Sequence, residues 1–513
     1  MIRVLAEKCT GCKRCEKNCP LDAIVVTEKL AEVDFYTCVN CRVCMRSCPQ
    51  EAILEAESST EFTDSKRVNI IICDSCPINC KIPEGKMGAC RRYYNEGAKL
   101  TRSVNLVVES IAPAPNNRLP HHPVVTGVGS GTNYPCFKPT PYIVQDKYEG
   151  IDVVTVVTEA PLSYSGVKVK IDANRHIGEE GAKVKREGQV VGMVTTEEYG
   201  AKMLTIGGAN LLSGSNDGFV VARTIVDLAN GEKVNLKVEK GSKLEIQSGK
   251  SPTIDGEEEH YMRIGCGSAT IGIMAEDFAR AVDEVIILDF HVIGLLTEHA
   301  AGRELGLKYS GVVPVGRKST NGRYFGEHGH GWGGTNVNCP EEAVLDIDMN
   351  RAFEGLKILV TETTGQKAAL LEVTKEGRVQ EITMTSEAKE AVKKLSDNCE
   401  TSNVSVIYTG GTGGSARAGV TKIPKRLTEA IHRDEVRLTI GGAPTFVLPG
   451  GGINFMVDTS KVVPNSFSWV PTPATVAPVE YTMTKDKFEN IGGHTGNIKT
   501  KTQLLKELEV DQK

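Results

Sequence analysis

Apolar and polar positions alternate with a period of two over much of the stretch from about residue 150 to 250. The runs are Val153/Thr155/Val157, Val167/Val169/Ile171 and Val234/Leu236/Val238. Alternation of this kind places one face of a strand in a core and the other toward solvent. Turn residues separate the runs, so the sequence predicts a β-rich region.

Helical and extended segments alternate after about residue 260. The predicted helices cover residues 276–281, 386–395 and 423–433, and the predicted strands cover 284–289, 356–361 and 404–408. Such mixing is typical of α/β structure. With 513 residues, the chain is long enough for several domains, so we predict an α+β multidomain protein.

A cysteine pattern, Cys-x-x-Cys-x-x-Cys-x-x-x-Cys-Pro, occurs twice near the N-terminus, with the copies 29 residues apart. The first copy holds Cys9, Cys12, Cys15 and Cys19, and the second holds Cys38, Cys41, Cys44 and Cys48. This double pattern binds two [4Fe–4S] clusters, and the fourth cysteine of each copy serves the other cluster. We therefore predict one cluster on Cys9, Cys12, Cys15 and Cys48, and a second on Cys38, Cys41, Cys44 and Cys19. A zinc module and reduced structural thiols are the alternatives.

A third cysteine group, Cys73, Cys76, Cys80 and Cys90, follows this repeat. Its spacing matches no firm pattern, so a third iron–sulfur cluster, a structural zinc and neither of them stay open. The resulting division has a two-cluster ferredoxin-like domain over 1–58 and a cysteine-rich module over 59–105. A proline-rich segment with a β-rich domain covers 106–255, and a mixed α/β catalytic domain covers 256–513.

Glycine-rich turns lie beside predicted helices and strands at two places. The candidate cofactor-binding residues there are Gly265, Gly267, Ser268 and Thr270, and Gly410, Gly411, Gly413, Gly414 and Arg417. Backbone N–H groups at such turns can hold a phosphate. A flavin, FAD or FMN, is therefore a candidate cofactor, and ordinary tight turns in a chain with 52 glycines are the alternative that composition favours for any single loop.

Glycines also flank a set of functional side chains between residues 322 and 334. Tyr324, His328 and His330 are candidate proton donors, and Arg323 is a candidate for binding a carboxylate. Two isolated cysteines, Cys136 and Cys266, are further candidate donors. The proline-rich segment from Ile111 to Pro141 adds the candidate substrate-binding residues Arg118, His121 and His122. Surface histidines and buried structural cysteines are the alternative interpretations.

Composition narrows the function further. Lys+Arg 60 against Asp+Glu 65 gives a net charge of −5, which argues against a nucleic-acid-binding protein. The best apolar stretch, from Val282 to Leu296, contains charged residues, so no membrane span is expected. Sixteen cysteines without a secretory pattern indicate a cytoplasmic protein whose thiols are free to bind metal.

The residues above carry a resemblance over nearly the whole chain. The doubled cysteine head resembles bacterial-type two-cluster ferredoxins. Together with Cys73–Cys90, Ile111–Pro141, Thr158–Val167, Gly265–Thr270 and Tyr324–Gly334, it is similar to the 6-hydroxynicotinate reductase family. The resemblance implies a ferredoxin-dependent reduction of 6-hydroxynicotinate to 1,4,5,6-tetrahydro-6-oxonicotinate.

The chemistry of that reaction leads to further expectations. Clusters deliver electrons singly, whereas saturating a ring carbon–carbon bond takes two electrons, so a flavin is expected as the two-electron carrier. The expected partners are reduced ferredoxin, a small N-heteroaromatic substrate and a second copy of the chain in a homo-oligomer. Reduction of another N-heterocycle or enoate, and a non-catalytic electron-transfer subunit, are the alternatives.

Overall fold

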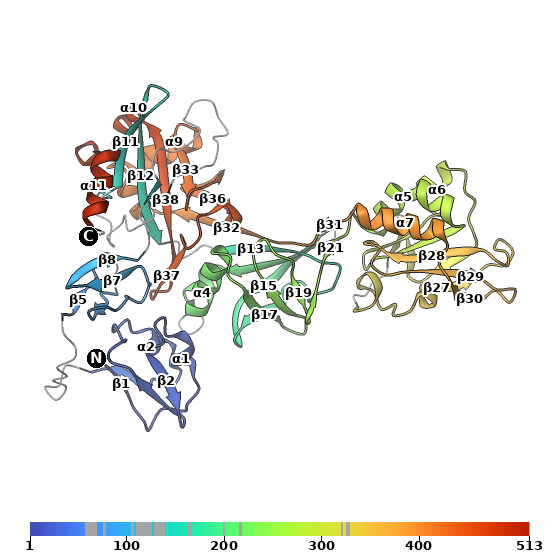
Figure 1. Cartoon of the computed structure of the whole chain (residues 1–513), viewed down its shortest axis with the longest axis horizontal. Helices are drawn as coiled ribbons and strands as arrows, with labels where there is room; N and C mark the ends of the chain where they lie inside the picture. Colours follow the sequence, from blue (N-terminus) through green and yellow to red (C-terminus); the bar gives the residue numbers. More distant parts are fainter. Residues whose placement is uncertain are drawn as a thin grey trace.

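The computed structural model describes residues 1–56, 69–74, 78–103, 107–108, 126–127, 139–140, 142–161, 166–198, 201–214, 218–319, 322–324 and 329–511. We name four parts: the head (1–56), the cysteine module (69–103), the central body (142–258 with 404–511) and the distal lobe (261–401). Figure 1 shows the head and module beside the central body, and the distal lobe at the other end of the molecule. The short paired strands β21 (Tyr261–Met262) and β31 (Glu400–Thr401) lie where the chain enters and leaves the distal lobe.

The head is a pseudo-symmetric pair of half-domains. Its elements are β1 (Ile2–Val4), α1 (Arg14–Asn18), β2 (Ile24–Thr27), β3 (Leu30–Val33), α2 (Val43–Ser47) and β4 (Ile53–Glu55), with β1 paired to β4 and β2 to β3. Backbone conformation repeats as well as sequence. Lys13 and Arg42, each just before a helix, have φ of 61° and 65°, and Asp22 and Glu51 have φ of 53° and 48°. These four non-glycine residues have positive φ, which is rare, and they recur at the 29-residue spacing, which confirms the internal repeat.

The cysteine module is built of two small hairpins. They pair β5 (Ile71–Ile72) with β6 (Lys81–Ile82), and β7 (Tyr93–Glu96) with β8 (Lys99–Arg102). A further short pair joins β9 (Val107–Val108) to β10 (Thr126–Gly127). Hairpins this small cannot bury a core of their own, so the module depends on the head and central body that it contacts.

Two sheets share one hydrophobic core in the central body. The seven-stranded sheet contains, in order, β34 (Ala443–Pro444), β33 (Arg437–Ile440), β38 (Ala474–Thr484), β12 (Ile151–Pro161), β11 (Tyr142–Tyr148) and β39 (Lys499–Thr500), with β37 (Ser468–Val470) paired to β38. The eleven-stranded sheet runs through β20 (Glu257–Glu258), β19 (Thr253–Ile254), β18 (Lys243–Ile246), β17 (Val234–Val238), β14 (Lys183–Arg186), β15 (Gln189–Glu198), β16 (Ala201–Gly207), β13 (Gly166–Asp172), β32 (Val404–Thr412), β36 (Ile453–Asp458) and β35 (Phe446–Leu448).

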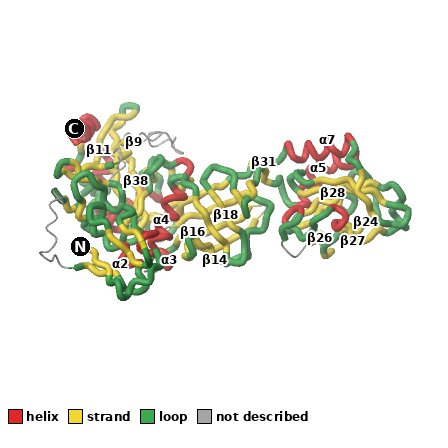
Figure 2. Tube along the Cα trace, turned by 60° about the horizontal axis from the view of Figure 1, so that its bottom comes forward, coloured by secondary structure: helices red, strands yellow, loops and turns green. Residues whose placement is uncertain are grey.

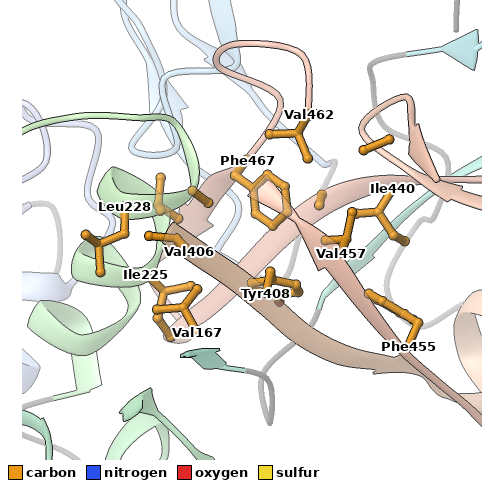
Figure 3. Close-up of a cluster of buried hydrophobic side chains, with 14 of the residues drawn as sticks. Val167, Ile225, Leu228, Val406, Tyr408, Ile440, Phe455, Val457, Val462 and Phe467 are labelled. Carbon is orange, nitrogen blue, oxygen red and sulfur yellow. The ribbon is translucent and has the colours of Figure 1, made fainter. Parts of the chain in front are cut away.

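Tyr408 lies inside this shared core. Figure 3 shows its ring between Val406 and Phe455, with Ile225 and Leu228 of helix α4 (Gly218–Ala229) nearby. The ring meets Phe467 edge-on, at 4.9 Å between centroids. Its hydroxyl lies 3.2 Å from the Thr475 hydroxyl, so burying the polar end of the side chain costs little. The body also contains α3 (Ala209–Leu212), α8 (Gly414–Ala418), α9 (Pro424–His432), α10 (Lys485–Asn490) and α11 (Lys501–Asp511).

The distal lobe has its own seven-stranded sheet. The order is β25 (Arg317–Ser319), β26 (Gly322–Tyr324), β23 (Val292–Leu295), β22 (Glu284–Leu288), β28 (Lys357–Glu362), β29 (Ala368–Val373) and β30 (Val379–Ile382), and only the β22–β28 pair is parallel among these. Helices α5 (Gly267–Ala281) and α7 (Ser386–Asp397) cover one face of the sheet (Figure 2). Helix α6 (Ala300–Glu304) and the pair β24 (Val312–Pro314) and β27 (Val344–Ile347) complete the lobe.

The predicted strands and helices after residue 150 are present, and helix α4 is an addition inside the region predicted as β-rich. Residues 256–513, predicted as one unit, are divided between two parts. The chain returns from the distal lobe at β31, and β32 and β38 then pair with β13 and β12 of the central body. None of the helices in the described segments is long and apolar enough to cross a membrane.

Candidate functional site

The eight head cysteines line two pockets. The first pocket is lined by Cys9, Cys12, Cys15 and Cys48, and the second by Cys19, Cys38, Cys41 and Cys44. This is the exchanged grouping that the sequence predicts. In the described part of the chain, no three His, Cys, Asp or Glu side chains are arranged around a single metal ion. A cubane cluster needs no such arrangement, because each of its four irons takes a different thiolate.

The exchanged cysteines accept equivalent backbone hydrogen bonds. The amide of Ala23 donates to Sγ of Cys19 at 3.2 Å, and the amide of Ala52 donates to Sγ of Cys48 at 3.4 Å. Hydrogen bonds to cluster sulfurs stabilise the negative charge on them and tune the reduction potential. The pockets therefore fit [4Fe–4S] clusters both in their donor atoms and in the groups around those atoms.

Burial favours the neutral thiol at two of the head cysteines. It raises the pKa of Cys15 to about 11 and the pKa of Cys41 to about 12. Neighbouring cysteines in the same pocket raise these pKa values further, because several thiolates repel one another. Iron binding must therefore displace protons from these thiols.

The cysteine module packs on the second pocket. Cys73 and Cys80 are buried, and they share a hydrophobic cluster with Val39 of the head and, at its margin, with Cys41. The amide of Lys81 donates to the Val39 carbonyl at 3.0 Å. The third cysteine group thus lies directly beside the second predicted cluster, while Cys76 falls outside the described residues.

The same module also contacts the central body. Arg92 forms an ion pair with Glu159 of β12, and the two side chains are only 11% and 7% exposed. Cys90 packs against a small hydrophobic cluster on β37 and β38 that contains Val470, Ala474 and Val476. The head itself contacts α4, where Arg223 donates to the Lys17 carbonyl at 2.7 Å.

Polar side chains lie at the end of β32, in the central body. The hydroxyls of Tyr481 and Thr412 are both buried. Burial raises the pKa of Tyr481 to about 12, although hydrogen bonding with Thr412, the charge of Arg417 and hydrogen bonding with Thr158 oppose the shift. An added Cβ at Gly413 or Gly414 would meet nothing within 4 Å, so the loop after Thr412 borders open space. Gly410 and Gly411 belong to strand β32 itself.

The other predicted phosphate site is closed. A Cβ on Gly267 would lie 2.2 Å from the Val292 carbonyl oxygen, so helix α5 packs tightly on β23 at its start. The amide of Gly267 lies 3.5 Å from Oδ2 of Asp289, and Ser268 contacts His299 at 3.1 Å. A carboxylate of the chain itself therefore faces the helix N-terminus, which disfavours a flavin phosphate at Gly265, Gly267, Ser268 and Thr270.

The remaining predicted residues are distributed as follows. Strand β26 carries Arg323 and Tyr324, paired with Ile293 and Val292 of β23. Cys266 is half-buried just before α5, and His330 is exposed in the same lobe. The other candidates lie outside the described residues: Arg118, His121, His122, Cys136 and His328.

A buried charged cluster at the seam between central body and distal lobe was not predicted. Arg263 pairs with Asp289, and Lys202 of β16 lies over the Phe290 ring at 3.8 Å. Burial, and then the charge of Arg263, lower the pKa of Lys202 to about 6. A signal for it exists in the sequence, because Lys202 occupies the same strand face as the buried Leu204 and Ile206.

Comparisons with known proteins agree with the cysteine geometry. Residues 8–52 match the family described as a 4Fe-4S dicluster domain. The chain is 53% identical, over 97% of its length and 99% of the relative, to the 6-hydroxynicotinate reductase of Eubacterium barkeri. The comparison with solved structures found no match.

Proposed function

The chain belongs to the 6-hydroxynicotinate reductase family, and we propose that it reduces a ring carbon–carbon double bond of 6-hydroxynicotinate with electrons from reduced ferredoxin. The product would be 1,4,5,6-tetrahydro-6-oxonicotinate. One observation carries the proposal: three cysteine groups pack in succession from the head to the central body. Clusters on these cysteines would supply one-electron transfer in that direction.

We place the reduction at the end of β32, next to the part of the central body that the cysteine module contacts. Thr158 precedes Glu159, the partner of Arg92, and lies close enough to Tyr481 to affect its pKa. The turn at Gly413 and the start of helix α8, with Gly414 and Arg417, is the better of the two predicted flavin sites because it borders open space. A flavin bound there would supply the two-electron step.

Tyr481 and Arg417 have separate roles in the proposed reaction. The lactam form of the substrate conjugates a ring double bond with the carbonyl, so its reduction consumes two electrons and two protons. Tyr481, which stays protonated at neutral pH, would give a proton to the ring carbon next to the carbonyl. Arg417 adds positive charge near the hydroxyl, which favours the enolate-like oxygen in the transition state.

The test is a cofactor inventory joined to an assay. The protein is purified without oxygen, its iron, sulfide, zinc and flavin are measured, and 6-hydroxynicotinate is offered with reduced ferredoxin or viologen. We expect about twelve irons per chain, flavin and turnover. About eight irons with zinc would make the cysteine module structural. Clusters without flavin or turnover of any N-heterocycle or enoate would overturn the proposal in favour of an electron-transfer subunit.

A further inference from the structure

The guanidinium of Arg263 is hydrogen-bonded on one side only, among the described residues. Its side chain is 1% exposed, and its Nη1 donates to Oδ1 of Asp289. Its Nε and Nη2 have no hydrogen-bond partner among the described residues. These two nitrogens form the edge of a guanidinium that donates two parallel N–H bonds. A buried donor pair of this kind is expected to have an acceptor.

The chain does not supply that acceptor through Asp289. Oδ1 of Asp289 receives Nη1 of Arg263, and Oδ2 accepts from the backbone amide of Val292 at 3.1 Å and lies 3.5 Å from that of Gly267. Both carboxylate oxygens are therefore engaged away from the Nε–Nη2 edge. The acceptor that completes Arg263 has to come from elsewhere.

Lys202 and Arg263 lie against the same aromatic ring. Nζ of Lys202 lies 3.8 Å from the centroid of the Phe290 ring, and Cζ of Arg263 lies 4.9 Å from it. Lys202 comes from the central body, whereas Arg263 and Phe290 come from the distal lobe. Two basic side chains from opposite sides of the seam share one ring, and Asp289 is bonded to one of them, Arg263.

We propose that the Nε–Nη2 edge of Arg263 binds the carboxylate of a small molecule at this seam, with the amino group of Lys202 as a neighbouring hydrogen-bond donor. A planar carboxylate matches the two parallel donors in geometry and carries one negative charge. A phosphate group takes more donors, and the nearby helix N-terminus already faces Asp289. The inference goes beyond the reductase activity and does not rest on it, because binding is measured without any electron donor.

The experiment is isothermal titration of the oxidised holoprotein with acetate, 6-hydroxynicotinate and inorganic phosphate in separate runs. The test variant is Arg263→Lys, which keeps the charge but removes the paired donors. The matched control is Arg280→Lys on the exposed face of the same lobe, where Arg280 is 73% exposed. We expect Arg263→Lys to weaken carboxylate binding at least tenfold and Arg280→Lys to leave it unchanged.

The probes separate the possible sources of the carboxylate. If only the binding of 6-hydroxynicotinate depends on Arg263, the site is one for the ring substrate. If the binding of acetate depends on Arg263 as well, the site is a general carboxylate site. Equal affinities in wild type and Arg263→Lys, or a preference for phosphate, overturn the proposal in favour of ordered water or another anion.

A second variant keeps the proposal testable if Arg263→Lys misfolds. Lys202→Met keeps most of the apolar side chain and removes the amino group from the buried seam, so the fold is expected to survive. We expect carboxylate affinity to fall at least threefold in Lys202→Met. Unchanged affinity in this variant, together with a misfolded Arg263→Lys, also overturns the proposal.

Discussion

Arg92 of the cysteine module forms a buried ion pair with Glu159 of strand β12 in the central body. The pair joins the third cysteine group to the strand that leads to Thr158 and the polar site around Tyr481. Because breaking a buried pair leaves one charge without compensation, single substitutions cost far more than the pair contributes. This ion pair and the hydrophobic packing at Cys90 both join the module to the body.

We predict that Glu159→Leu lowers the free energy of unfolding by about 3–5 kcal/mol. The double variant Arg92→Met/Glu159→Leu should recover most of that loss, since no buried charge is left unpaired. Denaturant titration of the anaerobic holoprotein, followed by cluster absorbance, measures both. Equal stability of the single and double variants would show that the pair is not buried in solution.

Cys19 belongs to the first cysteine pattern but lines the second pocket. We expect Cys19→Ala to reduce the iron content by up to four atoms per chain and to change only the spectrum of the cluster on Cys38, Cys41 and Cys44. Cys399→Ala is the matched control, because Cys399 is a half-buried cysteine outside these groups. Iron analysis and electron paramagnetic resonance check the result, and loss of the other cluster instead would contradict the exchanged grouping.

The head was predictable because its information is local. Two-residue gaps between cysteines dictate which thiolates one loop can offer, and Pro20 and Pro49 mark the ends of both copies. Strands such as β12 and β17 were predictable for the same reason, since a period of two is read within a few residues. Helix α4 was missed because three valines and one isoleucine, residue types typical of strands, lie on its buried face.

Long-range arrangement was not predictable from these patterns. The two glycine-rich loops read alike in sequence, yet one lies on α5 of the distal lobe and the other after β32 of the central body. Only the structure shows that Asp289 faces the first loop. The seam between Lys202 and Arg263 joins residues about sixty positions apart, and no local pattern connects them.

Tyr481 provides a direct test of the proposed reduction site. Tyr481→Phe removes the hydroxyl but keeps the ring volume, so the fold and the cluster content should be unchanged. We expect the turnover of 6-hydroxynicotinate to fall by about 10²–10⁴-fold, the usual effect of losing a general acid. Tyr408→Phe, in the shared core, is the control with the same chemical change. Full turnover in Tyr481→Phe would move the donor to Cys266, His330, Tyr324 or a residue outside the described chain.

Glu480 is fully buried in the seven-stranded sheet, where its Oε2 accepts from the Thr439 hydroxyl at 2.6 Å. Burial raises the pKa of Glu480 well above 4.5, so the folded protein holds a proton that the unfolded chain releases. Stability of the wild type therefore falls as pH rises above about 4.5, by up to 1.4 kcal/mol per pH unit. In urea titrations, the free energy of unfolding of Glu480→Gln should therefore rise relative to the wild type as pH increases from about 5. A constant difference across that range would contradict the raised pKa.

Lys202 shows the opposite dependence. Its pKa falls from 10.5 to about 6 on folding, chiefly through burial and secondly through Arg263. Between those values the unfolded chain binds more protons than the folded one, so wild-type stability rises with pH by up to about 1.4 kcal/mol per unit. Lys202→Met should remove this slope and be more stable than the wild type at pH 7 in denaturant titrations. Parallel curves for the two proteins would contradict the buried lysine. A variant that gains stability while losing carboxylate affinity would show that Lys202 is kept for binding at a cost to folding.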